Sequence, residues 1–541
     1  MFFSRYLHRY HPVRTSLYRS PQLSRLRIAS GFCPPRLAPY TTTLPNEHAR
    51  LCKAGLDSVK DQQHIIQSDS QRRTIYALAS PLGKAGVAVI RVSGPDALLV
   101  WQQVVRPAGF GSKHSSPKPW KMYRCSILHP STHELLDEGL AVYFKGPRSF
   151  TSEDTVELHI HSGRAVVSSC LAALSSLPYC RLAEPGEFTR RAFLSGKLDL
   201  TQVEGLKDLI NSETESQRKL ALQATTGVFR TWLENLRKEI IACLGHIEAL
   251  IDFGEEDIEA NTHRIAKERA QAIIREIQNH LSSFKRGEIM RTGLKVAIFG
   301  PPNVGKSSLF NYLAQREAAI VSNVPGTTRD VLEISIDIGG IPVIIIDTAG
   351  IRDTDDQVEK LGIQRAIDRL EGSDMLLCML AAENFHAHAG FPPDMNLPPT
   401  LKSRFSASNV LFLINKCDLL TPQNLEALSG ALRHYQKRAW IVSLSTGDGL
   451  DLFIRQLGEI ITTRYRTDDK LSEPLLHNER HRVHLQQALE FLQAFIVTPD
   501  SDIILGAEEL RYAAQAIGRI SGRIDTEDIL DVIFRDFCIG K

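Results

Sequence analysis

The chain of 541 residues has no uninterrupted apolar run that approaches the roughly 18 residues of a membrane span. We therefore expect no transmembrane helix. Its nine cysteines are scattered and form no Cys-x-x-Cys pair, which argues against a zinc knuckle or a disulfide framework and favours a reducing compartment. The remaining composition, 43% hydrophobic and 23% charged, is ordinary for a soluble globular protein, and the length predicts about three domains.

Acidic residues are absent before Glu47. A segment that is rich in arginine and serine, free of acids and without an apolar secretory core is typical of a mitochondrial presequence. We predict this presequence over residues 1–45, followed by a polar linker over 46–72. A disordered basic arm that binds nucleic acid is the alternative. The seven arginines of the segment are Arg5, Arg9, Arg14, Arg19, Arg25, Arg27 and Arg36.

The net charge limits how the protein can hold RNA. The whole chain carries a formal charge of +2, so loss of the seven arginines leaves −5. An acidic mature protein cannot hold RNA by bulk charge. Any RNA affinity must then come from local patches or from a partner.

Three kinds of pattern follow the linker and predict a multidomain fold. Residues 73–200 alternate short β-rich runs with glycines, which predicts an α+β N-terminal domain. Apolar residues then recur at steps of three and four over 201–290, and helical character returns within 466–541, which together predict one discontinuous α-helical domain. Residues 291–465 lie between the two segments and are expected to form an inserted domain. The aperiodic stretch 381–408 is expected to be a surface loop. The helical core stripe is Phe229, Leu233, Leu236, Ile240, Cys243, Ile247 and Leu250.

The stretch 300–308 reads Gly-Pro-Pro-Asn-Val-Gly-Lys-Ser-Ser between a strand-like run and a helix-like run, which is the context of a P-loop. Its backbone N–H groups can surround phosphate oxygens, its lysine can reach the β- and γ-phosphates, and its first serine can ligate Mg²⁺. A chance glycine-rich turn is the alternative, and the complete spacing disfavours it. The predicted nucleotide contacts here are Gly300, Asn303, Val304, Gly305, Lys306, Ser307 and Ser308, with Ser307 on Mg²⁺.

Further loops predict that the nucleotide is GTP. After the strand-like run 410–414, Asp418 of an Asn-Lys-Cys-Asp sequence can accept from guanine N1–H and N2–H₂, donors that adenine lacks at those positions, and such sites discriminate by roughly 10⁴. Leu444 and Ser445 depart from the Ser-Ala-Lys-like turn with which GTPases contact guanine O6. Because that contact is made largely by the backbone, we expect recognition of O6 to be weakened and not lost. Thr328 is the second predicted Mg²⁺ ligand. The other predicted contacts are Ser322, Thr327, Asp347, Thr348, Ala349, Gly350, Asn415, Lys416 and Ser443.

With these loops, residues 291–465 predict a Ras-like α/β P-loop GTPase domain inserted between the two helical segments. Ile351 occupies the position of the glutamine that orients water in Ras-like proteins, but its side chain is apolar and cannot do so. An arginine finger, which supplies about 10³ to 10⁵ in rate, is not evident either. Another group must therefore orient the water and supply the missing positive charge. The candidates are a monovalent cation in the place of the finger and an acid further along switch II.

Four stretches together resemble the MnmE/TrmE tRNA-modification GTPases in their mitochondrial form, over nearly all of the chain from Thr74 to Lys541. They are residues 86–94 (Gly-Val-Ala-Val-Ile-Arg-Val-Ser-Gly), 147–154 (Pro-Arg-Ser-Phe-Thr-Ser-Glu-Asp), 185–200 (beginning Pro-Gly-Glu-Phe-Thr-Arg-Arg-Ala-Phe), and the C-terminal Phe-Cys-Ile-Gly-Lys of 537–541. The combination is far more specific than any one motif.

The resemblance implies that the N-terminal domain binds a 5-formyltetrahydrofolate-type one-carbon donor and drives homodimerisation. The matching folate positions are Arg91, Glu157, Lys197 and Lys541, whose charges suit the carboxylates and the pterin N–H groups of folate. Without the motifs these charged residues would simply indicate a solvated surface. Ser162 stands where the family usually has glycine, which could restrict backbone approach at that corner.

The resemblance also implies activation by K⁺ and by dimerisation of the GTPase domains. The matching K⁺ positions are Asn303, Ser322, Val324 and Thr327, and the water-orienting acid falls on Glu359. An exposed acid at a helix start is the alternative for Glu359. Cys538 could be a nucleophile that assists uridine C5 activation, or a small apolar residue that closes a pocket.

Together with the first segment, the resemblance implies a K⁺-dependent GTPase of the mitochondrial matrix. It also implies that the chain acts with an FAD-dependent MnmG-type partner and modifies C5 of the wobble uridine of mitochondrial tRNAs to a carboxymethylaminomethyl-type product. One rival is a ribosome-assembly or translation-associated GTPase switch, which the N-terminal signature and the C-terminal tail leave unexplained. A second is a folate aminomethyltransferase with a regulatory GTPase attached.

Overall fold

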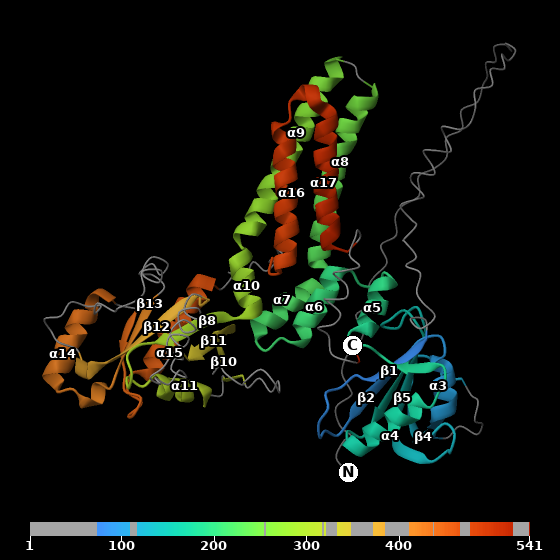
Figure 1. Ribbon diagram of the computed structural model, residues 1–541, viewed down its shortest axis with the longest axis horizontal. Helices are drawn as coiled ribbons and strands as arrows, with labels where there is room; N and C mark the ends of the chain where they lie inside the picture. The colour runs from blue at the N-terminus through green and yellow to red at the C-terminus, as the bar shows by residue number, and fades with distance from the viewer. Residues whose placement is uncertain are drawn as a thin grey trace, which may run out of the picture. The chain divides into compact units, whose positions relative to one another are not determined.

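The computed structural model of the chain describes residues 73–108, 116–253, 256–315, 319–320, 333–347, 372–384, 410–435, 438–465, 476–522 and 540 (Figure 1). The chain divides into Met1–Gln67 and Ser68–Lys541, and all described residues belong to the second unit. The predicted presequence and the whole predicted linker lie outside them. Among the described helices, none combines the length and the apolar character that a membrane span requires.

A mixed sheet with helices forms the N-terminal domain, as predicted for an α+β fold. The described strands are β1 (Thr74–Leu78), β2 (Ala88–Ser93), β3 (Val105–Pro107), β4 (Met122–Leu128), β5 (Leu135–Phe144), β6 (Thr155–Ile160) and β7 (Cys180–Leu182), in the order β3-β4-β5-β6-β2-β1-β7. The helices are α3 (Ala97–Val104), α4 (Arg164–Ser175) and α5 (Glu187–Leu194). Because β2 and β6 are antiparallel with Arg91 opposite Glu157, the sheet register brings two predicted site residues together.

Long helices form the second domain: α6 (Leu200–Ile210), α7 (Glu215–Thr225), α8 (Val228–Phe253), α9 (Glu256–Ser282), α10 (Phe284–Thr292), α16 (Glu479–Val497) and α17 (Ile503–Ile520). Capping boxes start two of them, with Asp199 before α6 and Thr214 before α7. All seven residues of the predicted stripe on α8 are buried, which confirms that the stripe is core.

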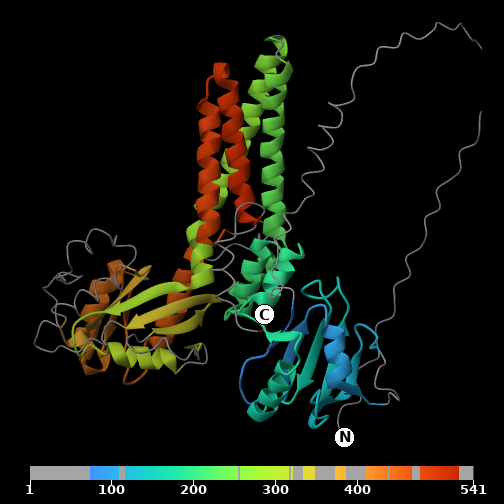
Figure 2. The same cartoon turned by 45° about the vertical axis from the view of Figure 1, so that its right-hand side comes forward.

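The two helical segments, far apart in sequence, share one core. Residues of α8 and α9 pack with residues of α16 and α17, and the four helices lie side by side in both views (Figures 1 and 2). Within the predicted segment 466–541, helix α17 ends at Ile520, and Gly522 follows with φ +77°. A left-handed residue of this kind ends a helix.

The inserted domain is built on a second sheet in the order β14-β13-β12-β8-β11-β10-β9. Its strands are β8 (Leu294–Phe299), β9 (Ala319–Ile320), β10 (Glu333–Ile338), β11 (Ile341–Asp347), β12 (Met375–Ala381), β13 (Val410–Asn415) and β14 (Ala439–Ile441). The described helices are α11 (Lys306–Ala314), α14 (Pro422–Ala431) and α15 (Leu450–Tyr465). The strands from β14 to β11 are parallel, whereas β10 and β9 are antiparallel to their neighbours.

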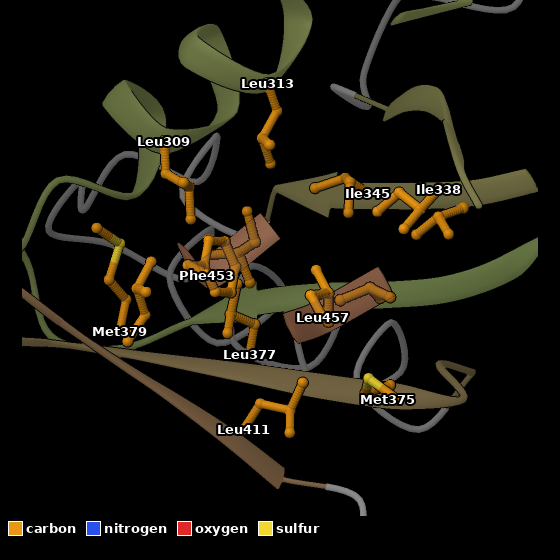
Figure 3. Packing of buried hydrophobic residues seen from close by; sticks show 14 of the residues in the cluster. Leu309, Leu313, Ile338, Ile345, Met375, Leu377, Met379, Leu411, Phe453 and Leu457 are labelled. Atoms are coloured by element: carbon orange, nitrogen blue, oxygen red, sulfur yellow. The ribbon is translucent and has the colours of Figure 1, made fainter. Parts of the chain in front are cut away.

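A continuous apolar core fastens this sheet to α11 and α15. Leu309 of α11 and Phe453 of α15 are fully buried and point toward strand residues such as Leu377 (Figure 3). This packing holds α11, and with it the loop before α11, against the sheet. The carboxyl ends of the parallel strands then meet at one edge, where ligands bind in α/β folds.

Candidate functional site

The P-loop joins β8 to α11 and has the backbone shape that its glycines permit. Gly300 has φ +149° and Gly305 has φ +103°, which side chains rarely allow. A Cβ on Gly300 would collide with the carbonyl of Met379, and one on Gly305 would lie 2.6 Å from Asn415 Nδ2. Both glycines are therefore required for the chain to pass the neighbouring strands. The result is a backbone cradle that fits phosphate oxygens.

The functional side chains of the loop lie at its open end. Asn303 is exposed and adopts φ +61°, a left-handed conformation that asparagine tolerates. Lys306 opens α11, and its Nζ donates to the carbonyls of Gly300 (2.9 Å) and Pro301 (2.8 Å). Ser307 and Ser308 follow in the first turn and are exposed. A helix N-terminus with an accessible hydroxyl and an ammonium fits a nucleotide phosphate with its Mg²⁺.

Asn415, the last residue of β13, links the P-loop to the guanine-specificity loops. Its side chain is buried, Nδ2 donates to Val304 O (2.8 Å), and Oδ1 accepts from Leu444 N (3.0 Å). The sequence predicted Asn415 as a nucleotide contact only. The structure shows that it joins three loops that are far apart in the chain.

Asp418 lies at the position that the sequence predicted for reading the base. Its carboxylate is exposed, and Ser443 Oγ donates to Oδ1 at 2.6 Å. This hydrogen bond holds the pKa of Asp418 below its ordinary value, so the group is ionised and can accept from guanine. Ser443 Oγ also lies 2.9 Å from Ser445 Oγ. Both serines thus support Asp418, a role that sequence reasoning missed because Asp418 and Ser443 are 25 residues apart in the chain.

Lys416 and Asp347 lie within the described part of the chain, whereas ten other predicted residues do not. Lys416 contacts Glu383 at 3.2 Å, and Asp347 is the last residue of β11. Among the described residues, no group of three or more His, Cys, Asp or Glu side chains is placed to hold a metal ion. The predicted residues that lie outside the described part of the chain are Ser322, Val324, Thr327, Thr328, Thr348, Ala349, Gly350, Glu359, Cys538 and Lys541.

The N-terminal domain brings Arg91 and Glu157 into contact. Arg91 Nε and one terminal nitrogen both lie 2.9 Å from Glu157 Oε1, and the guanidinium lies over the rings of Phe150 and Phe188. Burial raises the pKa of Glu157, but His159 and Arg91 more than offset this and lower it. Within the described residues, the buried Nε2 of His159 has no hydrogen-bond partner, and it lies 3.7 Å from Glu157 Oε2.

The 147–154 motif lies between Arg91 and Lys197. Lys197 Nζ donates to the carbonyl of Ser149, next to Phe150. Of the predicted folate residues, Arg91, Glu157 and Lys197 therefore lie on or beside one set of elements. Ser162, whose side chain was expected to restrict the pocket, is buried and donates to Gly83 O at 2.7 Å. It ties down the loop before β2.

A buried ion-pair network underlies the 185–193 motif. Arg191 is 6% exposed and donates to both carboxylate oxygens of Glu153 and to Oε1 of Glu187. Arg181 completes the pair with Glu187 at 2.8 Å, and Ser93 Oγ donates to Glu153 at 2.9 Å. Sequence reasoning missed this network, although the i,i+4 spacing of Glu187 and Arg191 was a signal for one of its pairs.

The C-terminal tail reaches the N-terminal domain. Gly540 is buried with φ +99°, and a Cβ there would collide with the carbonyl of Leu78 at the end of β1. Only glycine lets the chain pass this close to the β1 backbone at this position. Gly540 is thus seated on the domain that carries Arg91 and Glu157.

The sheet order, the P-loop and the specificity loops define a P-loop GTP-binding protein whose nucleotide domain is inserted into a helical domain. Two family models match the chain: the MnmE helical domain over residues 200–538, and the GTP-binding protein TrmE N-terminus over 74–197. The chain belongs to the MnmE/TrmE family, and the resemblance seen in its motifs is confirmed. It is accordingly a GTP hydrolase of tRNA modification.

Relatives match along most of the chain. The mitochondrial 5-taurinomethyluridine-[tRNA] synthase subunit GTPB3 of Danio rerio is 44% identical over 86% of this chain and 93% of its own length. The tRNA modification GTPase MnmE of Parvibaculum lavamentivorans is 43% identical over 86% of this chain and 100% of its own length. The solved G domain of the T. maritima FeoB iron transporter is 26% identical to this chain, covering 31% of this chain and 97% of its own length, with a TM-score of 0.22.

Proposed function

We propose that this chain is a K⁺-dependent GTPase of the mitochondrial matrix that modifies C5 of the wobble uridine of mitochondrial tRNAs. It acts as a homodimer with an FAD-dependent MnmG-type partner and takes its carbon from a 5-formyltetrahydrofolate-type donor. The observation that carries the proposal is the match to a mitochondrial tRNA-uridine synthase subunit over 86% of the chain. The arginine-rich, acid-free first segment supports the location.

In this proposal, GTP hydrolysis and carbon transfer take place in different domains. GTP hydrolysis drives opening and closing of the GTPase domains, and the carbon transfer takes place at the N-terminal domain. The acidity of the chain without its first segment supports a partner that supplies much of the grip on tRNA.

Mass spectrometry of mitochondrial tRNA nucleosides from a deletion strain tests the proposal. Loss of the C5 modification with intact ribosomal subunits is the expected result. Normal modification with defective subunits would contradict it and favour the ribosome-assembly switch. The mass of the missing nucleoside also separates a glycine-derived product of the carboxymethylaminomethyl type from a taurine-derived one.

Asn303→Ala should keep GTP binding and lose K⁺ stimulation of hydrolysis. In the proposal the exposed side chain of Asn303 holds the cation that replaces an arginine finger, a role worth about 10³ to 10⁵ in rate, so stimulation should fall about tenfold or more. Hydrolysis rates in KCl and NaCl give the measurement. Asn303→Gly is the matched control for backbone strain, because glycine accepts φ +61°. Retained stimulation in the glycine variant would show that the side chain is not the ligand.

Arg91→Ala should weaken binding of 5-formyltetrahydrofolate about 10- to 100-fold. A hydrogen bond to a charged group contributes about 1.5–3 kcal/mol, and each 1.4 kcal/mol changes the dissociation constant tenfold. Calorimetric titration measures the affinity. Arg124→Ala is the control, because the Arg124–Glu138 pair is exposed on the same sheet and 3.5 Å long. Equal affinities in the two variants would remove Arg91 from the folate site.

Glu359 and Cys538 lie outside the described residues, and their roles rest on the family motif. We infer that Glu359 orients the attacking water. Wild-type K⁺-stimulated hydrolysis in Glu359→Ala would exclude that role. Unchanged modified nucleosides after Cys538→Ser would leave Cys538 as a small residue that closes a pocket.

A further inference from the structure

The turn that follows β14 carries Leu444 and Ser445 where GTPases have a Ser-Ala-Lys-like sequence. It lies beside Asp418, whose exposed carboxylate supplies two hydrogen-bond acceptors. The edge of guanine presents one acceptor, O6, next to two donors, N1–H and N2–H₂. Because the carboxylate serves the two donors, complete recognition of this edge needs one further donor that lies beside Asp418 and reaches O6.

Most backbone N–H groups of this turn already have acceptors. Leu444 N donates to Asn415 Oδ1 at 3.0 Å, and Thr446 N donates to Ser443 Oγ at 3.2 Å. The N–H groups at 443 and 447 donate to backbone carbonyls at 3.0 and 2.9 Å. Each N–H carries a single proton, so these groups cannot give a full hydrogen bond to guanine as well. The remaining donors of the turn are the N–H and the hydroxyl of Ser445.

The hydroxyl of Ser445 is held close to the carboxylate that reads the base. Its Oγ lies 2.9 Å from Ser443 Oγ, which donates to Asp418 Oδ1 at 2.6 Å. Hydrogen bonding by Ser443, and to a smaller extent by Ser445, lowers the pKa of Asp418. Ser443 is fully buried whereas Ser445 is exposed, so the hydroxyl of Ser445 is the one that can meet a bound base.

The proton of Ser445 can turn to a ligand without leaving a buried group unpaired. Ser443 Oγ gives its own proton to Asp418 and also accepts from Thr446 N. When Ser445 turns its O–H away, Ser443 therefore keeps both a donor and an acceptor as partners. The turn itself stays fixed, because the side chain of Leu444 packs on the core of the GTPase domain. A hydroxyl needs only rotation about one bond to change its acceptor.

We propose that Ser445 determines specificity at position 6 of the purine, with its hydroxyl donating to guanine O6. A side chain thus takes over a contact that GTPases make largely with the backbone of this turn. A hydroxyl can also accept, so the turn by itself does not reject a 6-amino group, and the exclusion of adenine depends on Asp418. The inference rests on the proposed function in one respect, which is that the base lies against Asp418.

The test compares GTP with 6-thio-GTP, in which sulfur, a weak acceptor, replaces O6 while N1–H and N2–H₂ remain. Calorimetric titration of the full chain gives both dissociation constants. The wild type should bind GTP about three- to tenfold more tightly than 6-thio-GTP, the factor that one neutral hydrogen bond supplies. In Ser445→Ala, the affinity for GTP should fall by about that factor, and the preference for GTP should shrink to less than about twofold.

Three further variants separate contact with the base from support of the turn. Ser445→Thr keeps a hydroxyl and should retain the preference for GTP to within about twofold of wild type. Ser443→Ala removes the support of Asp418, so it should weaken both nucleotides equally and keep the preference. Thr446→Ala is the matched control, because its exposed hydroxyl on the same turn donates to Asp448 at 2.7 Å. It should leave both affinities unchanged.

Equal affinity of the wild type for the two nucleotides would overturn the proposal. So would an unchanged affinity for GTP in Ser445→Ala, which would assign the contact to the N–H of Ser445, or an equal loss of both nucleotides, which is the pattern of a residue that only supports Asp418. Asp418→Asn separates this inference from the GTP site itself. A loss of GTP affinity in Asp418→Asn but not in Ser445→Ala refutes the role of Ser445 alone, whereas no loss in either variant refutes both.

Discussion

Replacing Asp418 by asparagine is expected to lower the affinity for GTP by about 10² to 10⁴ and to raise the affinity for xanthosine triphosphate. The carboxylate accepts from N1–H and N2–H₂ of guanine, whereas an asparagine presents one acceptor and one donor. The donor meets a guanine donor but suits the carbonyl at position 2 of xanthine. The hydrogen bond from Ser443 orients the side chain in both cases.

Competition binding with GTP and xanthosine triphosphate measures the exchange of specificity. Asp448→Asn is the matched control, because Asp448 is an exposed acid near the same loop whose side chain accepts from Thr446 at 2.7 Å. It should leave both affinities unchanged. A loss of both nucleotides in Asp418→Asn would indicate that the loop had collapsed, and equal affinities in variant and wild type would show that Asp418 does not read the base.

Asn415→Ala is expected to release the P-loop and the 443–445 turn from each other. The substitution leaves Val304 O and Leu444 N unpaired in a buried place, and each unsatisfied group costs about 1–3 kcal/mol. The GTPase domain should lose about 2–4 kcal/mol of local stability. Affinity for GTP should fall about 30- to 1,000-fold, because the bound conformation is no longer the resting one.

Hydrogen exchange locates this effect. The amide of Leu444, which donates to Asn415 Oδ1, should exchange faster in the variant, together with the P-loop amides, while amides of the helical domain stay protected. Asn424→Ala, an exposed asparagine in the first turn of α14, is the control and should change neither exchange nor affinity. Unchanged protection of Leu444 would show that its hydrogen bond to Asn415 contributes nothing to the site.

The glycines of the P-loop illustrate why a short motif can be read without a structure. Gly300 and Gly305 have positive φ angles that other residues disfavour, and the lysine and serines that follow act from the first turn of the next helix. All of these requirements fall within nine consecutive residues, so the local sequence pattern predicts phosphate binding. The same holds for the stripe on α8, whose periodicity alone placed it in a core.

Asn415 and Asp418 make contacts that the local sequence pattern does not predict. Their residue types and their places after a strand predicted contact with guanine. The bond from Asn415 to Val304 spans 111 positions in sequence, and the support of Asp418 by Ser443 spans 25. Such pairings depend on the order of parallel strands in the sheet, which is decided by packing and not by any one segment.

The sequence by itself determined GTP as the nucleotide, the helical core stripe and the family. Each depends on spacing within a few turns of chain or on a signature of some ten residues. Only the tertiary structure decided that Arg191 is buried between two carboxylates, that Gly540 passes the backbone of Leu78, and that Glu204 meets Arg480 across 276 positions. The physical reason is that a buried charge is stable only with its partner in place, and that partner comes from whichever distant segment the fold packs beside it.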